Sequence, residues 1–258
     1  MRRRTIAKSK NMMEISDHIT GNSYIGIPGK KIRSKRENVT PEVVRKNNIR
    51  LAEKRLRLLI DMNFKSDDYY LTLTFKDEQS EKEAKEKIVK FFRRIRDAFN
   101  KAKHVCKYIY IMEIQGRIHF HALLNRGIEL STQLLKKWWP HGYTKIEFYR
   151  GEAEDAIGLA KYFLKERKSE MSNHMIHKKW VSSKTLEQPE VKTKTIKATE
   201  WRQEIKIPNG YYLDKDSVYE GINNYGFPFR TYRLIRLPEW RAKDEQAKSA
   251  KTLSILRE

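Results

Sequence analysis

The stretch KYIYIMEIQGRIHFHALLN, residues 107–125, constrains the fold more than any other part of the chain. It contains two runs rich in β-forming residues, separated by Gln-Gly-Arg. Glycine adopts the positive φ that tight hairpins require, so residues 115–117 are expected to form a three-residue loop. In the second run, apolar residues alternate with polar ones, as in a strand with one buried face. The sequence therefore predicts a β-hairpin here.

The polar positions of this hairpin bring three metal-ligating side chains to one face. Side chains two residues apart in a strand point to the same side of a sheet, so His119 and His121 share a face. In the expected register, Glu113 lies opposite His119, and Ile111 lies opposite His121. Two imidazoles and one carboxylate bind a divalent cation and leave positions open for substrate. A zinc hydrolase uses the same ligands, and a histidine pair without a metal is the simpler alternative.

The charge of the chain narrows the class of partner. The 258 residues include 55 Lys and Arg against 33 Asp and Glu, which gives a formal net charge of +22. A chain this basic is attracted to polyanions, and nucleic acid is the first candidate. No apolar run approaches the roughly 18–20 residues of a membrane span, so no membrane partner is expected. The single cysteine, Cys106, is expected to be a small core residue in a reducing cytoplasm.

The hydrophobic pattern predicts an α+β fold. The order of elements from residue 66 to residue 168 is β-α-β-β-α-β-α. This order predicts a central antiparallel sheet with helices packed on one face and the metal ligands on the other. The expected helices cover about residues 41–62, 80–100, 132–138 and 152–168, and the expected strands cover 69–75, the hairpin 107–125, and 143–150.

A second candidate group lies on the last of these helices. Tyr162 falls off the apolar stripe of the helix at about 100° per residue, Lys165 neighbours it three residues on, and Gly158 leaves space beside its ring. An exposed tyrosine beside a lysine is either a nucleophile or a ring that lies across the helix edge. The stripe itself consists of Ala153, Ala156, Ile157, Ala160, Phe163 and Leu164.

The two groups together suit the cleavage of a phosphodiester. A cation held by Glu113, His119 and His121 acts as a Lewis acid on the phosphate oxygens. The hydroxyl of Tyr162, with an ordinary pKa of about 10, attacks the phosphorus, and Lys165 stabilises the developing charge. The products are a phosphotyrosine link to DNA and a free 3′-hydroxyl.

Three motifs in this order resemble the HUH endonucleases, and within them the rolling-circle replication initiators of small bacterial plasmids and phages. The motifs are YLTLTF, EIQGRIHFHALL and AKYFLKE. The residues HFH fit the His-hydrophobic-His motif of the family, the segment from Tyr162 to Lys165 fits its YxxK motif, and Glu113 matches the third metal ligand by register. The resemblance covers roughly residues 66–190, and residues 180–190 are similar to a segment that follows the nuclease core in bacterial members.

The resemblance implies Mg²⁺ or Mn²⁺ as cofactor and single-stranded DNA at a hairpin replication origin as substrate. It implies nicking and joining through a 5′-phosphotyrosine intermediate, which initiates rolling-circle replication of a plasmid or phage. A separate host helicase is expected, because residues 21–26 have the glycine spacing of a P-loop but lack its Lys and Ser/Thr. DNA contacts are expected from Thr72, Thr74, Lys161, Arg117, Lys30, Lys31 and Arg33.

The remaining segments flank this core. Residues 1–65 are expected to form a basic N-terminal arm, irregular up to residue 38, and a helix, residues 66–168 the HUH nuclease core, and residues 169–258 a basic and aromatic C-terminal extension. Weak strand signals lie at 202–207 and 229–237. The aromatics of this extension either stack unpaired bases or form a small core, and the core interpretation is favoured.

Some alternatives remain open on the sequence. A second tyrosine is absent from the expected face, since positions 158 and 166 are Gly and Glu, so termination needs another route. Glu154, Asp155 and Glu166 are candidates for activating a water that releases the DNA. The rival functions are a conjugative relaxase or single-strand transposase with the same core, and a nucleic-acid-binding protein without catalysis.

Overall fold

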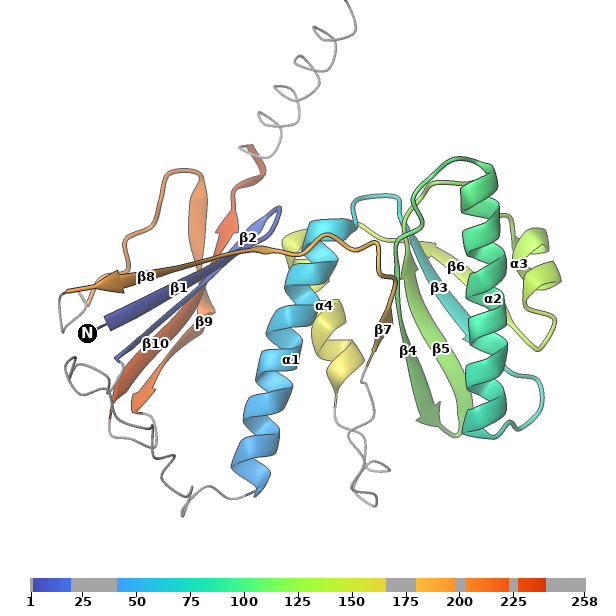
Figure 1. Ribbon diagram of the computed structural model, residues 1–258, viewed down its shortest axis with the longest axis horizontal. Helices are drawn as coiled ribbons and strands as arrows, with labels where there is room; N and C mark the ends of the chain where they lie inside the picture. The colour runs from blue at the N-terminus through green and yellow to red at the C-terminus, as the bar shows by residue number, and fades with distance from the viewer. Residues whose placement is uncertain (1, 20–40, 166–179, 198–202, 223–226, 240–258) are drawn as a thin grey trace, which may run out of the picture. The chain divides into compact units, whose positions relative to one another are not determined.

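The computed structural model of the protein describes residues 2–19, 41–165, 180–197, 203–222 and 227–239 (Figure 1). The chain forms two compact units, one made of Met1–Asn48 with Pro189–Glu258 and the other of Ile49–Gln188. Each unit is built on its own five-stranded antiparallel sheet. Helix α1 (Pro41–Asn63) begins in the first unit and ends in the second.

The second unit has the element order that the sequence predicts. Its sheet has the strand order β6-β3-β5-β4-β7, and every pairing in it is antiparallel. The α+β fold with a central antiparallel sheet is therefore confirmed. Its strands are β3 (Tyr69–Thr74), β4 (Tyr108–Gln115), β5 (Arg117–Leu124), β6 (Thr144–Phe148) and β7 (Val181–Ser182), and its further helices are α2 (Glu81–Lys101), α3 (Thr132–Trp138) and α4 (Ala153–Leu164).

Helices α2 and α3 lie on one face of this sheet (Figure 1). Helix α2 begins with a capping box, in which the Ser80 hydroxyl accepts from the Glu83 backbone N–H and the Glu83 carboxylate accepts from the Ser80 backbone N–H. Trp139, which is fully buried, donates its Nε1–H to the Thr74 carbonyl at 2.8 Å. The core on this face includes the apolar side of β5, as predicted, with Ile118, Phe120, Ala122 and Leu124, and the stripe of α2, with Ala84, Ile88, Phe91, Phe92, Ile95 and Phe99.

Helix α4 lies on the other face of the sheet (Figure 1). This differs from the expectation that all helices pack on one face. Its apolar stripe is buried as predicted at five positions, while Ile157 is half-buried. Burying such a stripe removes apolar surface from water, which accounts for a helix on this face. The helix ends at Leu164, earlier than expected, and residues 166–168 lie outside the described residues.

The sheet of the second unit also includes residues that follow the expected nuclease core. Strand β7 pairs with β4 through Ile109 and Ser182. Asn63 at the end of α1 and the backbone of Glu187 exchange two hydrogen bonds, at 2.8 and 2.9 Å. The segment 180–188 is therefore part of this unit.

The first unit joins strands from both ends of the chain. Its strands β1 (Arg2–Lys8), β2 (Met12–Ile19), β8 (Glu190–Ile196), β9 (Tyr211–Ile222) and β10 (Pro228–Arg236) follow the order β8-β1-β2-β10-β9. The interpretation of residues 1–38 as irregular is therefore wrong for residues 2–19. Charged residues mask the alternation here, and Arg4 and Asp17 satisfy each other across β1 and β2 at 2.7 and 2.8 Å.

A small apolar core forms in the first unit. It is built on Ile15, Tyr232 and Leu234, with Tyr211 packed against it. Strand β10 confirms the strand signal at 229–237, whereas the described part of the signal at 202–207 contains no strand. Among the described residues, no helix combines the length and apolar character that crossing a membrane requires.

Candidate functional site

The hairpin of β4 and β5 has the predicted register. Glu113 pairs with His119, and Ile111 pairs with His121. The turn is tighter than the expected three-residue loop, because Gln115 and Arg117 still pair, and only Gly116, with φ of 72°, stands between the strands. The positive φ explains the glycine at this position. The register places the three predicted metal ligands on one face of the sheet.

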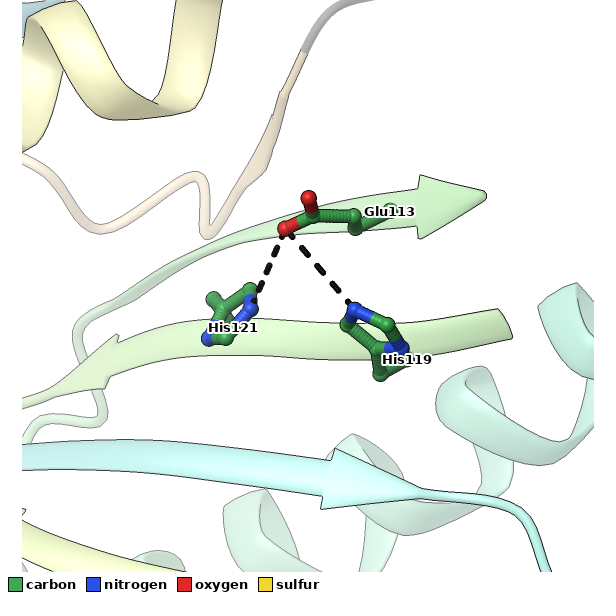
Figure 2. A group of neighbouring side chains, drawn as sticks. All are labelled: Glu113, His119 and His121. Atoms are coloured by element: carbon green, nitrogen blue, oxygen red, sulfur yellow. Dashed lines mark ion pairs between the residues drawn. The ribbon is translucent and has the colours of Figure 1, made fainter. Parts of the chain in front are cut away.

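Figure 2 shows these three side chains converging from the two strands. One ligand atom from each lies within 4.8 Å of the others. The Oε2 atom of Glu113 lies 3.2 Å from Nε2 of His121 and 3.9 Å from Nε2 of His119. The Glu113 side chain is only 6% exposed, so its charge is stabilised by the groups around it. A carboxylate oxygen and two imidazole nitrogens at this spacing fit a divalent cation.

His121 is held by two hydroxyl groups on β3. Its Nδ1 lies 3.1 Å from the hydroxyl of Tyr70 and 3.3 Å from Oγ1 of Thr72. The ring of Tyr70 stacks on the imidazole, with 5.9 Å between centroids and 14° between planes. Burial raises the pKa of Tyr70, so its phenol stays protonated and keeps its hydrogen-bonding proton. These contacts direct Nε2 of His121 toward Glu113.

Tyr162 reaches the same group of ligands from α4. Its hydroxyl donates to Oε2 of Glu113 at 3.0 Å and lies 3.2 Å from Nε2 of His121. The residue is 39% exposed, and a Cβ added at Gly158 would meet no atom within 4 Å. The structure thus brings the candidate nucleophile and the three candidate ligands together, with open space beside the glycine.

The other residue of the YxxK motif lies just beyond the helix. Lys165 is the C-cap of α4, and its backbone N–H donates to the carbonyl of Tyr162 at 3.3 Å. Its side chain is exposed, and within the described part of the chain it forms no ion pair or hydrogen bond. The role of Lys165 stays a prediction. Glu166, one of the candidates for activating water, lies outside the described residues.

The residues expected to contact DNA occupy different places. The hydroxyl of Thr72 is used on His121, while Thr74 donates to the carbonyl of Tyr143 at 3.3 Å. Arg117 is exposed beside the hairpin turn, and Lys161 is exposed on α4. The remaining three, Lys30, Lys31 and Arg33, lie outside the described residues. All seven stay predictions as DNA contacts.

Sequence reasoning did not assign Tyr70 to the site. The alternation in YLTLTF places Tyr70, Thr72 and Thr74 on one face of a strand. The pairing of β3 with β5, in which Thr72 lies beside His121, supplies the missing information. The polar positions of this strand were the available signal, but their partner on a distant strand was not evident.

The fold and site define a class of protein: an α+β unit whose antiparallel sheet presents a carboxylate, two imidazoles and a phenol on one face. Residues 68–167 match the model of a family of replication-associated proteins, the one described by its member ORF2. The matched segment is less than half of the chain and runs from β3 through α4. The resemblance to replication initiators is thereby confirmed for this segment.

Two further comparisons were made. No curated protein matches the chain significantly. The crystal structure of the hypothetical protein ORF119 from Sulfolobus islandicus rod-shaped virus 1 is similar at 20% sequence identity, with a TM-score of 0.34. The similarity covers 47% of this chain and 97% of that one.

Proposed function

We propose that the protein is a metal-dependent endonuclease and strand transferase that nicks and rejoins single-stranded DNA at a hairpin replication origin. A 5′-phosphotyrosine intermediate on Tyr162 links the two steps, and the nick initiates rolling-circle replication of a plasmid or phage. The observation that carries the proposal is the hydroxyl of Tyr162 within hydrogen-bond distance of both Glu113 and His121. The match to replication-associated proteins supports it.

Three residues would hold the cation. Oε2 of Glu113 and Nε2 of His119 and His121 offer one hard and two borderline ligands, a combination that suits Mn²⁺ and is compatible with Mg²⁺. When bound, the cation neutralises the charge of the phosphate oxygens. The hydroxyls of Tyr70 and Thr72 orient His121 for this task, because each accepts a hydrogen bond from Nδ1–H when Nε2 serves as ligand.

The chain's own residues carry the strand cleavage. The Tyr162 hydroxyl donates to a carboxylate, so its proton leaves toward Oε2 of Glu113 as its oxygen attacks the phosphorus. The bond between phosphorus and the 3′-oxygen breaks as the new bond forms, and that oxygen takes up a proton. Lys165, at the end of the helix, stabilises the phosphate charge. Rejoining is the reverse attack by a 3′-hydroxyl on the phosphotyrosine.

A covalent-adduct assay tests the proposal. The full chain is incubated with Mn²⁺ and a 3′-end-labelled single-stranded oligonucleotide that spans the hairpin next to its gene, and the denatured mixture is separated by size. Label should migrate with the protein, and Tyr162→Phe should abolish this band while binding is retained. His119→Ala should abolish cutting as well. An adduct that persists in the Tyr162→Phe variant would refute the assignment of the nucleophile.

Replication also requires unwinding of the duplex. We assign this step to a separate host helicase in the cytoplasm, because residues 21–26 lack the lysine and hydroxyl residues of a P-loop. The measurement is nick extension with and without added helicase. Extensive unwinding by the purified chain alone would contradict this assignment.

A further inference from the structure

The sheet face that carries the metal ligands extends to an exposed tyrosine. Glu113 pairs with His119, and His119 pairs with Thr74. The Thr74 backbone N–H donates to the carbonyl of Tyr143 at 2.9 Å, and the Tyr143 N–H donates to the hydroxyl of Thr74 at 3.2 Å. Because the next residue, Thr144, is buried on the helix side, alternation places Tyr143 on the ligand face. Tyr143 therefore continues this row of residues across the sheet.

The loop before β6 fixes this tyrosine beside β3. The backbone N–H of Lys76 donates to the carbonyl of His141 at 2.8 Å. A Cβ added at Gly142 would lie 2.3 Å from the Thr74 carbonyl oxygen and 2.7 Å from the Lys76 nitrogen, so only glycine permits this approach. The side chain of Tyr143 is nevertheless 64% exposed. A rigidly anchored, exposed aromatic ring binds a flat partner at little cost in conformational entropy.

Three cations of α2 lie around the same loop. Burial, and then the charges of Lys87, Arg94 and Lys90, lower the pKa of His141, which places all three cations near its ring. Arg94 donates to the carbonyl of Trp138 at 2.9 Å. In the part of the chain that the structure describes, none of the three forms an ion pair with an acid. This cationic group, Lys87, Lys90 and Arg94, is therefore an uncompensated positive patch.

We propose that Tyr143 and the cationic group form a subsite for the single strand that flanks the scissile phosphate. A nucleobase stacks on the ring of Tyr143, and the phosphates beyond it meet Lys87, Lys90 and Arg94. Two strand spacings, about 10 Å, separate Tyr143 from His119, which corresponds to about three stacked nucleotides. The inference rests on the proposed function, because the metal ligands mark the position of the scissile phosphate.

Stacking and charge make separable predictions for this subsite. A base in a single strand exposes its aromatic face, whereas a base in a duplex is already stacked on its neighbours. Loss of the Tyr143 ring should therefore weaken the binding of single strands and leave duplex binding unchanged. Phosphate contacts release counterions, so loss of cations should flatten the salt dependence of binding.

The stacking arm uses fluorescence anisotropy with a labelled 30-nucleotide single strand of mixed sequence. The full chain carries Tyr162→Phe, and EDTA is present, so that no cleavage occurs. Tyr143→Ala should lower the affinity about 5- to 150-fold, and Tyr143→Phe should retain it. The matched control is Phe148→Ala, which removes a ring that is 59% exposed on the same strand but pairs with the buried Tyr69 on the other face. It should leave the affinity unchanged.

The charge arm measures the affinity for the same strand across a series of salt concentrations. Lys90→Gln and Arg94→Gln should each reduce the slope of log affinity against log salt by about 0.7. Lys85→Gln is the control, because it removes a lysine from the same helix that is already paired with Glu81 at 2.9 Å. An unchanged slope in both test variants would overturn the phosphate contacts.

The remaining outcomes separate this inference from the proposed function. Equal effects of Tyr143→Ala and Phe148→Ala, or an equal loss of duplex and single-strand binding, would overturn the stacking contact. Thermal unfolding of each variant checks that the exposed substitutions leave the fold intact. A wild-type chain that forms the covalent adduct while Tyr143→Ala binds normally sinks only the subsite. A wild-type chain that binds through Tyr143 but forms no adduct sinks only the proposed function.

Discussion

At the scale of single residues, the orientation of His121 depends on two hydroxyls. Removing both in the variant Tyr70→Phe with Thr72→Val leaves Nδ1 without either partner. We expect the Mn²⁺ affinity to fall about 10- to 100-fold, as is usual when the group that orients a metal-bound histidine is lost. Isothermal titration calorimetry measures the change. Tyr143→Phe is the control, since it makes the same substitution away from the ligands, and an equal affinity in all three proteins would contradict the role.

The phenol of Tyr162 makes a second prediction at this scale. Its hydroxyl bonds to the same Glu113 oxygen and lies beside the same His121 nitrogen that would bind the cation. Tyr162→Phe should therefore preserve Mn²⁺ affinity or raise it by up to about tenfold, the value of one hydrogen bond to a charged group. His119→Ala should lower the affinity in the same titration. Weaker metal binding in Tyr162→Phe would show that the phenol is itself a ligand.

The residues of the site differ in how far they could be predicted from the sequence. Glu113, His119 and His121 lie within one hairpin, whose register follows from a period of two and a tight loop. Tyr162 was predicted as an exposed position of a helix, but its distance to Glu113 depends on how the helix packs. Tyr70 was missed, because its contact with His121 joins strands that are 51 residues apart in the chain.

At the scale of the elements, two glycines should respond in opposite directions. Gly142→Ala places a Cβ 2.3 Å from a backbone oxygen of β3, so we expect a loss of about 1–3 kcal/mol in the free energy of unfolding. Gly158→Ala lies in the interior of α4 with no atom within 4 Å, so it should stabilise by about 0.5–1 kcal/mol. Urea unfolding of both variants measures the two changes. A stabilised Gly142→Ala would mean that the loop is free to move.

The strand β4 and the residue before its start predict a loss of stability in alkali. Burial raises the pKa of Cys106 from 9.0 to about 12 and that of Tyr110 from 10.0 to about 12. The unfolded chain therefore ionises first, and each group contributes a stability that is complete below pH 9 and is lost as the pH rises toward 12. Urea unfolding at pH 8 and pH 10.5 measures the decline. It should be smaller in Cys106→Ala, and an identical decline in that variant would remove the cysteine from the explanation.

Elements with strong periodicity were predictable, and elements defined by distant partners were not. The boundaries of α2 follow from Ser80 and its capping box, and α3 covers the predicted residues 132–138. By contrast, β1 and β2 were missed. Their strands alternate around buried charges such as Asp17, which only the pairing with Arg4 satisfies, and their neighbours β8 and β10 come from the far end of the chain.

At the scale of the whole molecule, one unit is inserted into the other. The chain leaves the first unit after Asn48 and returns to it at Pro189. The second unit contains its own complete sheet, its own core and all four residues of the candidate site. The first unit instead requires both ends of the chain, because β1 and β2 are flanked by β8 and β10.

This arrangement predicts that a longer fragment behaves worse than a shorter one. Residues 49–188 alone should fold, bind Mn²⁺ and form the covalent adduct, since no strand of their sheet is removed. Residues 1–188 keep β1 and β2 but lose β8 and β10, which leaves two strands with open edges that recruit other chains. Size-exclusion chromatography with light scattering compares the two fragments with the full chain. We expect monomeric residues 49–188 and aggregation of residues 1–188, and a monomeric longer fragment with the same thermal stability would show that the β1–β2 pair is stable without its C-terminal partners.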